Sequence, residues 1–327
     1  MAGTVVAGRT LLIASTGGHL EQLMRLKDRL RPAVDEVEWV TFDDSQTRSL
    51  LTGERVHFVR YVAPRSPSTV LHNLPVANRI LRDGDFNRIV TTGSAVVLSF
   101  LPLARARGVS CHFIESAARS NGPSMTGSMV SRIPGMHLYS QYRVWADRRW
   151  LYRGSLFDRY RPATAEAIPG SRARRVVVTF GTMRTYEFRR AAEALIKLLP
   201  DVTTPDAQVL WQVGITDTSG LGIESRRSVP GAELRSAIKQ ADLVIAHAGV
   251  GSALTALDLG KAPVLLPRRQ ALNEMVDDHQ LMIAGELDSR GLAISRDPSD
   301  LRVDDLARAM TMAVTTEQVS TPFDLVE

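Results

Sequence analysis

The clearest chemical signal in this chain is a turn of glycine, histidine and serine between two apolar segments. The turn His247-Ala-Gly-Val-Gly-Ser252 follows a predicted buried strand over residues 243–246 and precedes a predicted helix that begins at Ser252. A helix start offers unpaired backbone N–H groups and the positive end of the helix dipole, and both attract anions. Gly249 and Gly251 let a phosphate approach the backbone closely. We therefore expect an anion site here, with the diphosphate of a nucleotide sugar as its ligand.

A second loop of the same kind lies earlier in the chain, where Phe180-Gly-Thr-Met-Arg184 follows a strand and opens a helix. Gly181 permits close approach of a phosphate, Thr182 can donate a hydroxyl hydrogen bond, and Arg184 can pair with a diphosphate or a donor carboxylate. His247 can donate to a diphosphate oxygen and stabilise the leaving nucleotide. The alternatives are an ordinary strand-to-helix turn with a solvated arginine, and a histidine that only shapes its own turn.

Three polar residues further along are suited to the rest of a nucleotide sugar. Asp258 lies six residues beyond Ser252, nearly two helical turns, and one carboxylate can accept from both hydroxyls of a ribose. Asp278 and Gln280 stand in the run Asp277-Asp-His-Gln280, which we expect to open the next helix. The amide of Gln280 can bind sugar hydroxyls. Alternatively, Asp258 is a solvated helix acid, and the acids near residue 278 serve only the helix dipole.

The amino-terminal half carries a histidine in a comparable place. Thr16-Gly-Gly-His19 closes the first predicted strand, and Gly17 with Gly18 can bring an acceptor close to the backbone. The turn lacks the third glycine of a dinucleotide-binding fingerprint, so it is a weak nicotinamide site. We expect His19 to act as a general base, because the ordinary pKa of histidine lies near working pH. The alternative is a core or capping histidine.

Another group of polar residues follows the predicted strand over 109–114. It comprises Glu115 and Arg119, with Ser124 and Thr126 in the run Ser124-Met-Thr-Gly127. We expect Glu115 to be a base or an orienting partner for the histidine of the first turn, and Arg119, Ser124 and Thr126 to contact the acceptor. A buried Glu–Arg pair with a purely structural role explains the same pattern equally well.

These motifs need a scaffold of alternating strands and helices, and both halves of the chain show that alternation. The predicted strands cover 11–15, 37–42, 56–59, 88–92, 109–114, 175–180, 208–213, 242–246 and 263–266. The pattern indicates an α/β protein with two Rossmann-like, doubly wound parallel sheets. We expect domains over 1–160 and 174–327 that face each other across a cleft, joined by a Pro- and Gly-containing linker over 161–173.

Length and composition limit the class of protein. The 327 residues suit two domains, no apolar run reaches the ~20 residues of a membrane span, and the first residues carry no signal-peptide pattern. The single cysteine, Cys111, excludes an intramolecular disulfide and a cysteine-rich zinc site and favours the cytoplasm.

Charge is uneven between the two halves. Residues 1–160 hold 21 Arg and Lys against 13 Asp and Glu, whereas the remainder holds 19 against 22. A basic first half suggests a membrane surface, a lipid diphosphate or a nucleic acid as partner. The arginines and aromatic residues of 142–160 fit a membrane or single-stranded nucleic acid, or else aromatic core packing by a helix and a strand.

The motifs together resemble a known enzyme family. Val178-Thr-Phe-Gly-Thr182, the 247–252 turn and Asp278-His-Gln280 resemble the donor-binding domain of family 28 glycosyltransferases. The amino-terminal half resembles the membrane-recruited partner subunit of the enzyme that adds the second N-acetylglucosamine to a dolichol-diphosphate sugar, through four runs: 15–20, 115–119, 124–127 and 152–157. Bacterial exopolysaccharide enzymes of similar make also consist of two polypeptides. In this chain the acceptor part and the donor part look fused into one polypeptide, with the acceptor part first. Similarity to the lipid II-forming peptidoglycan enzyme, through Ser252-Ala-Leu-Thr255, implies ribose recognition by Asp258.

The resemblance implies a GT-B fold and an inverting transfer without a metal or other cofactor. A sugar such as GlcNAc or GlcA would pass from a UDP-sugar to a polyprenyl-diphosphate-linked sugar. The enzyme would be cytoplasmic, peripheral at the inner face of the plasma membrane and in contact with its anionic surface, with no nucleic-acid partner. The loop from Arg268 to Glu274 matches the family only loosely. Three alternatives remain: a glycosyltransferase with a soluble acceptor, a UDP-sugar 2-epimerase, and a non-catalytic lipid-bound scaffold.

Overall fold

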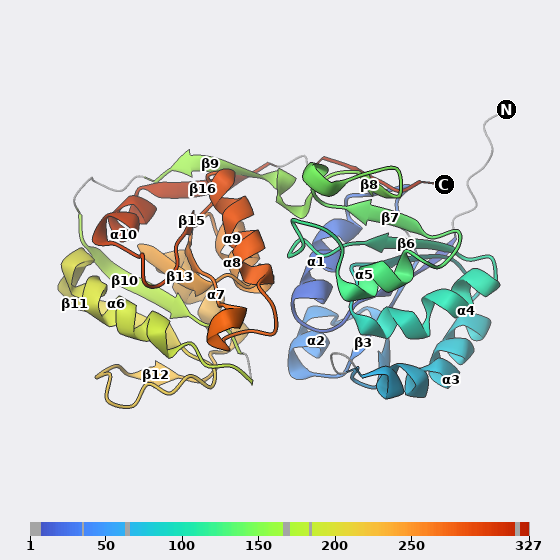
Figure 1. Cartoon of the computed structure of the whole chain (residues 1–327), viewed down its shortest axis with the longest axis horizontal. Helices are drawn as coiled ribbons and strands as arrows, with labels where there is room; N and C mark the ends of the chain where they lie inside the picture. Colours follow the sequence, from blue (N-terminus) through green and yellow to red (C-terminus); the bar gives the residue numbers. More distant parts are fainter. Residues whose placement is uncertain are drawn as a thin grey trace. The chain divides into compact units, whose positions relative to one another are not determined.

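The computed structural model describes residues 8–34, 36–62, 66–165, 171–182, 185–317 and 321–326. Its contacts divide the chain into two compact units (Figure 1). Unit 1 comprises Met1–Asp158 together with Ser320–Glu327, and unit 2 comprises Arg159–Val319. Within the described residues, no helix is long and apolar enough to cross a membrane.

Unit 1 is built on a parallel sheet of seven strands in the order β4-β3-β1-β5-β6-β7-β8. The strands are β1 (Arg9–Ile13), β3 (Val37–Phe42), β4 (Arg55–Val59), β5 (Phe86–Thr91), β6 (Ser110–Ile114), β7 (His137–Ser140) and β8 (Trp150–Tyr152). The helices are α1 (Gly18–Lys27), α2 (Ser45–Leu50), α3 (Pro67–Asp83), α4 (Leu101–Ala106) and α5 (Met125–Val130). Short 3₁₀ turns cover Ala95–Ser99 (η1), Arg143–Trp145 (η2) and Leu156–Arg159 (η3).

Apolar runs explain the buried position of these strands. In β1 the consecutive residues Leu11, Leu12 and Ile13 are fully buried, as expected for a strand covered on both faces. One face packs against α3, α4 and α5 in a single cluster that includes Ile80, Leu101 and other apolar side chains. Helices on a parallel sheet whose order reverses beside β1 make this a doubly wound fold.

Unit 2 repeats the plan with six parallel strands in the order β12-β11-β10-β13-β14-β15. The strands are β10 (Ala173–Thr179), β11 (Thr203–Gln212), β12 (Ser225–Arg226), β13 (Leu243–His247), β14 (Val264–Leu266) and β15 (Ile294–Ser295). The helices are α6 (Arg189–Val202), α7 (Gly231–Gln240), α8 (Val250–Asp258), α9 (His279–Ser289) and α10 (Val303–Met310), with a 3₁₀ turn over Gln270–Leu272 (η4).

Side-chain alternation along β10 shows how the layers of unit 2 form. Val176 and Val178 point into a cluster with α6 and α10, whereas Val177 points into a second cluster with α7 and α8. Successive strand residues face opposite sides of a sheet, so one apolar strand supports both helical layers. The fold predicted from the sequence, an α/β protein with two doubly wound sheets, is confirmed.

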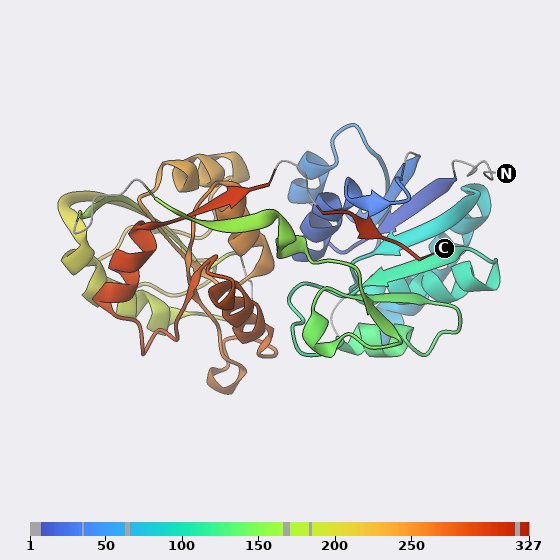
Figure 2. The same cartoon turned by 90° about the horizontal axis from the view of Figure 1, so that it is seen from above.

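Two short ladders lie outside these sheets. The first pairs β9 (Tyr160–Thr164) with β16 (Met312–Thr316) in antiparallel register, and Figure 2 shows the two strands side by side. The second pairs β2 (Leu30–Arg31) with β17 (Phe323–Asp324), so the last described residues return to unit 1.

The structure corrects the boundaries that the sequence suggested. The predicted linker over 161–173 begins inside β9 and ends in β10, and residues 166–170 lie outside the described residues. The predicted second domain also ran to the chain end, whereas the segment that carries β17 belongs to unit 1. The ladder of β17 with β2 joins residues 293 positions apart, as for Phe323 and Leu30, and leaves no local pattern, so the sequence cannot reveal it.

The segment 142–160 differs from the helix and strand that we expected. Its described elements are two 3₁₀ turns, β8 and the first residue of β9. Its aromatic side chains do pack in the core, since Trp150 is 6% exposed and Phe157 and Tyr160 are buried. The structural explanation of this arginine- and aromatic-rich run is therefore confirmed.

Candidate functional site

Each sheet has one point where the strand order reverses, and the predicted motifs gather there. In unit 1 this switch point lies between β1 and β5, and in unit 2 it lies between β10 and β13. Ligands of open α/β sheets bind outside the carboxyl ends of the strands at such points. The turn before α1 follows β1, the loop after Thr179 follows β10, and the turn after His247 follows β13.

His19 lies in the first turn of α1, half-buried, beside the end of β5. Its Nδ1 lies 2.8 Å from the carbonyl oxygen of Thr92, and Thr92 Oγ1 donates back to the His19 carbonyl at 2.7 Å. A carbonyl only accepts, so Nδ1 carries the proton, and in the uncharged form of the ring the lone pair lies on Nε2. This tautomer suits a general base. Gly17, with φ +76°, caps the helix in a conformation that favours glycine.

The loop after β5 lies beside His19 at the switch point of unit 1, and sequence reasoning missed it. Gly93 has φ +103°, and a Cβ there would lie 3.5 Å from His19 Cε1. Ser94 adopts φ +76°, a strained conformation for a residue with a side chain, and its buried hydroxyl has no hydrogen-bond partner. The run Thr92-Gly-Ser94 at the end of a predicted strand was the signal that could have identified it.

Glu115 is buried in its own loop. Its Oε1 accepts from the backbone N–H of Ser116 at 3.0 Å, and Oε2 accepts from the N–H and hydroxyl of Ser124 at 2.8 and 3.0 Å. Burial raises the pKa of Glu115, while these bonds and the charge of Arg119 act in the opposite direction. A Cβ at Gly127 would overlap Glu115 Oε2. The geometry favours a structural role that shapes the start of α5, and a role as base stays a prediction.

Gln22, which sequence reasoning missed, joins the helix of His19 to the loop of Glu115 through hydrogen bonds. The side chain is 1% exposed and donates from Nε2 to the Gly18 carbonyl at 3.0 Å and to Ser116 Oγ at 3.1 Å. Its Oε1 accepts from the Ala117 N–H at 2.7 Å. The structure thus brings together the His19 and Glu115 motifs. Two other residues predicted to contact the acceptor, Arg119 and Thr126, follow Glu115 in the sequence and are half-buried.

In unit 2 the helix after β13 begins two residues earlier than predicted. Gly249 is the N-cap of α8 without a side-chain cap, so Val250 is the first helical residue and Ser252 the third. The N–H groups of this first turn have no intrahelical acceptor. Such groups can bind an anion, and Gly251 and Ser252 are half-buried beside them, but the anion site itself stays a prediction.

His247 lies between the two predicted glycine loops. A Cβ at either Gly181 or Gly249 would come within 3.0 Å of its ring, so both glycines are needed for its position. Its Nδ1 lies 3.4 Å from the Thr179 carbonyl, a longer contact than that of His19. Burial lowers the pKa of His247 to about 3, assisted by the charge of Arg268, so the ring is neutral at physiological pH. Thr182 is exposed beside it, and Arg184 lies outside the described residues.

Asp258 ends α8, six residues after Ser252. Six residues turn the helix by about 600°, which leaves Asp258 roughly 120° away from Ser252, whereas Gly251 lies on the same face. Tyr160 Oη donates to Asp258 Oδ1 at 2.5 Å.

Asp278 and Gln280 hold the loop after β14. The run Asp277–Gln280 opens α9 as predicted, with Asp278 as the N-cap residue; the Asp278 side chain accepts from the Gln270 N–H at 2.9 Å, and its contact with the donor stays a prediction. Gln280 is 2% exposed, and its Oε1 accepts from the Arg268 N–H at 3.0 Å. These contacts favour a supporting role, and the predicted contact of Gln280 with sugar hydroxyls stays a prediction.

Arg268 is a buried cation behind the Gly181 loop. The side chain is 1% exposed and donates to the carbonyls of Phe180, Tyr186 and Glu187 at 3.1, 3.1 and 2.9 Å, while its Nε has no partner. Burial lowers its pKa to about 10, so it stays charged. Neighbouring Glu274 pairs with Arg190 at 2.7 Å. Arg268 and Glu274, the two ends of the loop that matches the family only loosely, therefore both have partners within the protein.

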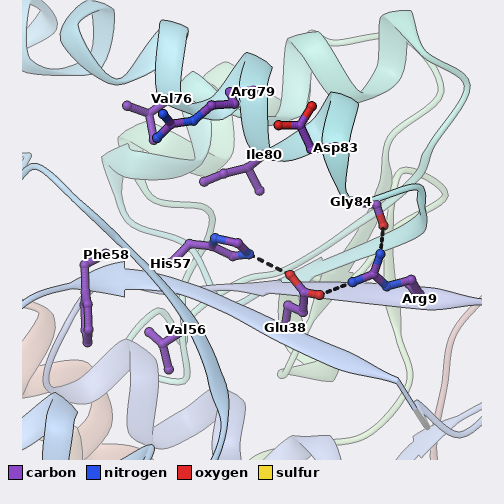
Figure 3. A pocket seen from close by; sticks show the side chains of 10 residues that line it. All are labelled: Arg9, Glu38, Val56, His57, Phe58, Val76, Arg79, Ile80, Asp83 and Gly84. Carbon is purple, nitrogen blue, oxygen red and sulfur yellow. Dashed lines mark hydrogen bonds and ion pairs between the residues drawn. The ribbon is translucent and has the colours of Figure 1, made fainter.

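The pocket in Figure 3 lies elsewhere in unit 1. It encloses about 390 Å³ between β3, β4 and α3. Its polar floor is Glu38, which pairs with Arg9 and, at 2.6 Å, with His57 (Figure 3). Glu38 is the second residue of β3, so this pocket is at the amino end of that strand, away from the switch point. Within the described ranges, no group of three His, Cys, Asp or Glu is placed to hold a metal ion.

Comparisons with known proteins agree with this geometry. Residues 175–319 match the model of the glycosyltransferase family 28 C-terminal domain. The UDP-N-acetylglucosamine--N-acetylmuramyl-(pentapeptide) pyrophosphoryl-undecaprenol N-acetylglucosamine transferase of Neisseria meningitidis serogroup C (strain 053442) is 25% identical over 303 residues, 84% of this chain and 81% of that protein. The UDP-N-acetylglucosamine transferase subunit ALG13 of Yarrowia lipolytica is 42% identical over 66 residues, 20% of this chain and 32% of that protein.

A solved structure supports the fold over nearly the whole chain. The crystal structure of Acinetobacter baumannii MurG has a TM-score of 0.60 at 17% identity and covers 92% of this chain and 89% of that one. A likeness at this identity concerns the fold alone. With the family match in unit 2, it identifies this protein as a glycosyltransferase of the GT-B fold whose carboxyl-terminal unit matches the C-terminal domain of glycosyltransferase family 28 over residues 175–319.

Proposed function

We propose that this protein transfers a hexose, such as GlcNAc or GlcA, from a UDP-sugar to a polyprenyl-diphosphate-linked sugar in cell-surface polysaccharide or glycolipid synthesis. The observation that carries the proposal is the switch point of unit 2, where the uncapped start of α8 meets His247 and the Gly181 loop. The name of the Neisseria relative specifies a UDP-sugar donor and a pyrophosphoryl-undecaprenol acceptor, which supports the same classes of substrate here.

The donor diphosphate would bind at the first turn of α8. Backbone N–H groups and the helix dipole stabilise negative charge there, and the buried Arg268 adds a positive charge behind the Gly181 loop. A diphosphate beside His247 would also raise the pKa of that ring and favour its protonated, donating form. These groups support a metal-independent departure of UDP.

The acceptor hydroxyl would be deprotonated by His19 in unit 1. The bond from Nδ1 to Thr92 directs the lone pair of Nε2 toward the role of base, so the hydroxyl can attack the anomeric carbon in a single inverting displacement. Gly17, Gly18 and the loop with Ser94 line the same switch point and are the proposed contacts of the acceptor.

An apolar patch on α5 supports a membrane-facing role for unit 1. Met125 and Met129 are 60% and 46% exposed and lie four residues apart, on one face of the helix. Arg132 is exposed just beyond them, and Arg149 donates to the carbonyls of Ser131 and Ile133 at the same end of α5. Apolar side chains next to cations suit the interface of an anionic membrane, in keeping with peripheral attachment at the inner face.

The test is a nucleotide panel followed by a transfer assay, both in EDTA. UDP and one UDP-sugar should raise the unfolding temperature, since a ligand at 100 times its Kd adds ~2.7 kcal/mol of stability. That UDP-sugar should then label an undecaprenyl-diphosphate-linked sugar in detergent. No shift with any nucleotide would contradict the proposal. Transfer to soluble acceptors alone would indicate a glycosyltransferase with a soluble acceptor. Conversion of UDP-GlcNAc without any acceptor would indicate a UDP-sugar 2-epimerase.

A further inference from the structure

Asp258 occupies an unfavourable position for an ordinary surface acid. It is the last residue of α8, where the negative end of the helix dipole disfavours a carboxylate. The side chain is nevertheless held in place, because Tyr160 Oη donates to its Oδ1 at 2.5 Å. Tyr160 is 2% exposed, whereas Asp258 is half-buried. A buried phenol therefore fixes a partly accessible carboxylate.

The strand that carries Tyr160 is joined to the end of α8 by further contacts. Tyr160 pairs in register with Thr316 of β16. Along the same strand, the Val314 N–H donates to the Gly260 carbonyl at 3.0 Å. Ala313 forms an antiparallel bridge with Lys261. The ladder of β9 and β16 is thus hydrogen-bonded to Gly260 and Lys261, directly after α8. These contacts hold the Tyr160 phenol in a defined position relative to the end of α8.

Holding one carboxylate oxygen sets the plane of the group. A carboxylate accepts hydrogen bonds in that plane, along directions set by its two oxygens. Asp258 lies on the same face of α8 as Gly251. Gly251 belongs to the first turn of this helix, where the diphosphate is proposed to bind. Seven residues separate the two along α8, about 10 Å of helix, so the carboxylate can meet the nucleoside part of a donor whose diphosphate binds at the first turn. Two adjacent hydroxyls of a ribose are the donors that match such a group.

We propose that Tyr160 is a positioning residue that orients Asp258 to accept from the ribose hydroxyls of the donor nucleotide. The inference rests on the proposed function, because it requires a nucleoside diphosphate at α8. It adds that preference for a ribonucleotide over a deoxyribonucleotide depends on a residue which itself does not touch the ligand.

The experiment compares the binding of UDP and 2′-deoxy-UDP to the full chain by isothermal titration calorimetry. The wild-type protein should bind UDP at least tenfold more tightly, since a hydrogen bond to a charged group is worth about 1.5–3 kcal/mol. Tyr160→Phe should reduce this preference several-fold, because it weakens the binding of UDP more than that of 2′-deoxy-UDP, which keeps only the 3′-hydroxyl. Asp258→Asn should abolish most of it, and adding Tyr160→Phe to Asp258→Asn should change nothing more.

Tyr152→Phe is the matched control. Tyr152 Oη also donates to a carboxylate, that of Asp158 at 3.1 Å, but in unit 1. This variant should keep the wild-type preference. A Tyr160→Phe protein with the wild-type preference, or with equally weakened binding of both nucleotides, would overturn the inference while leaving the proposed function intact. A wild-type protein that binds neither nucleotide would overturn both.

Discussion

His19 and Thr92 are joined by two hydrogen bonds at the switch point of unit 1. The ring Nδ1 donates to the Thr92 carbonyl at 2.8 Å, and the Thr92 hydroxyl donates to the His19 carbonyl at 2.7 Å. The pair connects the first turn of α1 to the end of β5 and fixes both the tautomer and the orientation of the imidazole. The corresponding contact of His247 with Thr179 is 3.4 Å long. The ring of His19 is therefore held more closely by its carbonyl partner than the ring of His247.

Replacing His19 should remove the proposed base. His19→Ala should lower kcat about 10²–10⁴-fold, the usual contribution of a positioned base, and leave the Kd of UDP unchanged. His72→Ala is a control, because His72 is exposed on α3 and bonded only locally, to Ser68. Transfer rates and nucleotide affinities check both variants. A near-wild-type rate for His19→Ala would remove this residue as the base.

A side chain at Gly249 should disturb the donor site. The new Cβ would come within 3.0 Å of the His247 ring beside the start of α8, so we expect Gly249→Ala to weaken UDP binding at least tenfold. Gly285→Ala in α9 is the control, since a Cβ there meets nothing within 4 Å. It should leave binding unchanged and stabilise the helix by roughly 0.5–1 kcal/mol. Equal UDP affinities for the two variants would refute the proposed position of the diphosphate.

Glu115 should prove structural. In Glu115→Gln an amide NH₂ replaces one acceptor oxygen, and either orientation sets it against an N–H of Ser116 or Ser124. We expect the free energy of unfolding to fall by about 1–3 kcal/mol. Glu36→Gln, on a carboxylate that is 67% exposed, should have little effect. A Glu115→Gln protein with wild-type stability and a kcat lowered by 10² or more would instead assign Glu115 as the base.

Buried His112 should make the protein less stable in mild acid. It is 1% exposed, bonded to Ser110 and Tyr139, and burial lowers its pKa to about 3, aided by the charges of His137 and Arg88. The unfolded chain takes up the proton near pH 6.5 but the folded chain does not, so stability falls as pH falls from 6.5 toward 3.

The expected contribution of this histidine is about 2 kcal/mol lost between pH 6.5 and 5. Denaturant unfolding of unit 1, followed at both pH values in wild type and in His112→Gln, measures it. The variant should show a shallower pH dependence than wild type, and the exposed-residue variant His72→Gln should not. Identical pH dependence in all three proteins would contradict the assignment.

The α5 patch should govern attachment to membranes. Replacing Met125 and Met129 by Asp should reduce cosedimentation with vesicles that contain anionic lipid, because it places charge at an apolar interface. Activity toward a short-chain, water-soluble analogue of the acceptor should be unaffected. Leu272→Asp is the control, since Leu272 is 55% exposed in unit 2. Unchanged sedimentation of the α5 variant would show that another surface is used.

The sequence by itself determined the architecture and the location of both switch-point motifs. Buried strands appear as continuous apolar runs such as Leu11–Ile13, and glycine turns mark where a strand becomes a helix. These signals are local, because they depend on residues within one strand–turn–helix unit. For that reason the doubly wound fold, the start of α9 near Asp278 and the placement of His19 and His247 could all be predicted.

Only the tertiary structure decided what each polar side chain does at those positions. Gln22 bonds to Ser116, 94 residues away, and Tyr160 bonds to Asp258, 98 residues away. Arg268 reaches the Phe180 carbonyl across 88 residues. A polar side chain is satisfied by whichever groups the packed fold brings within about 3 Å, and residue spacing along the chain carries no record of that proximity. The division between supporting and ligand-facing residues is therefore set by packing.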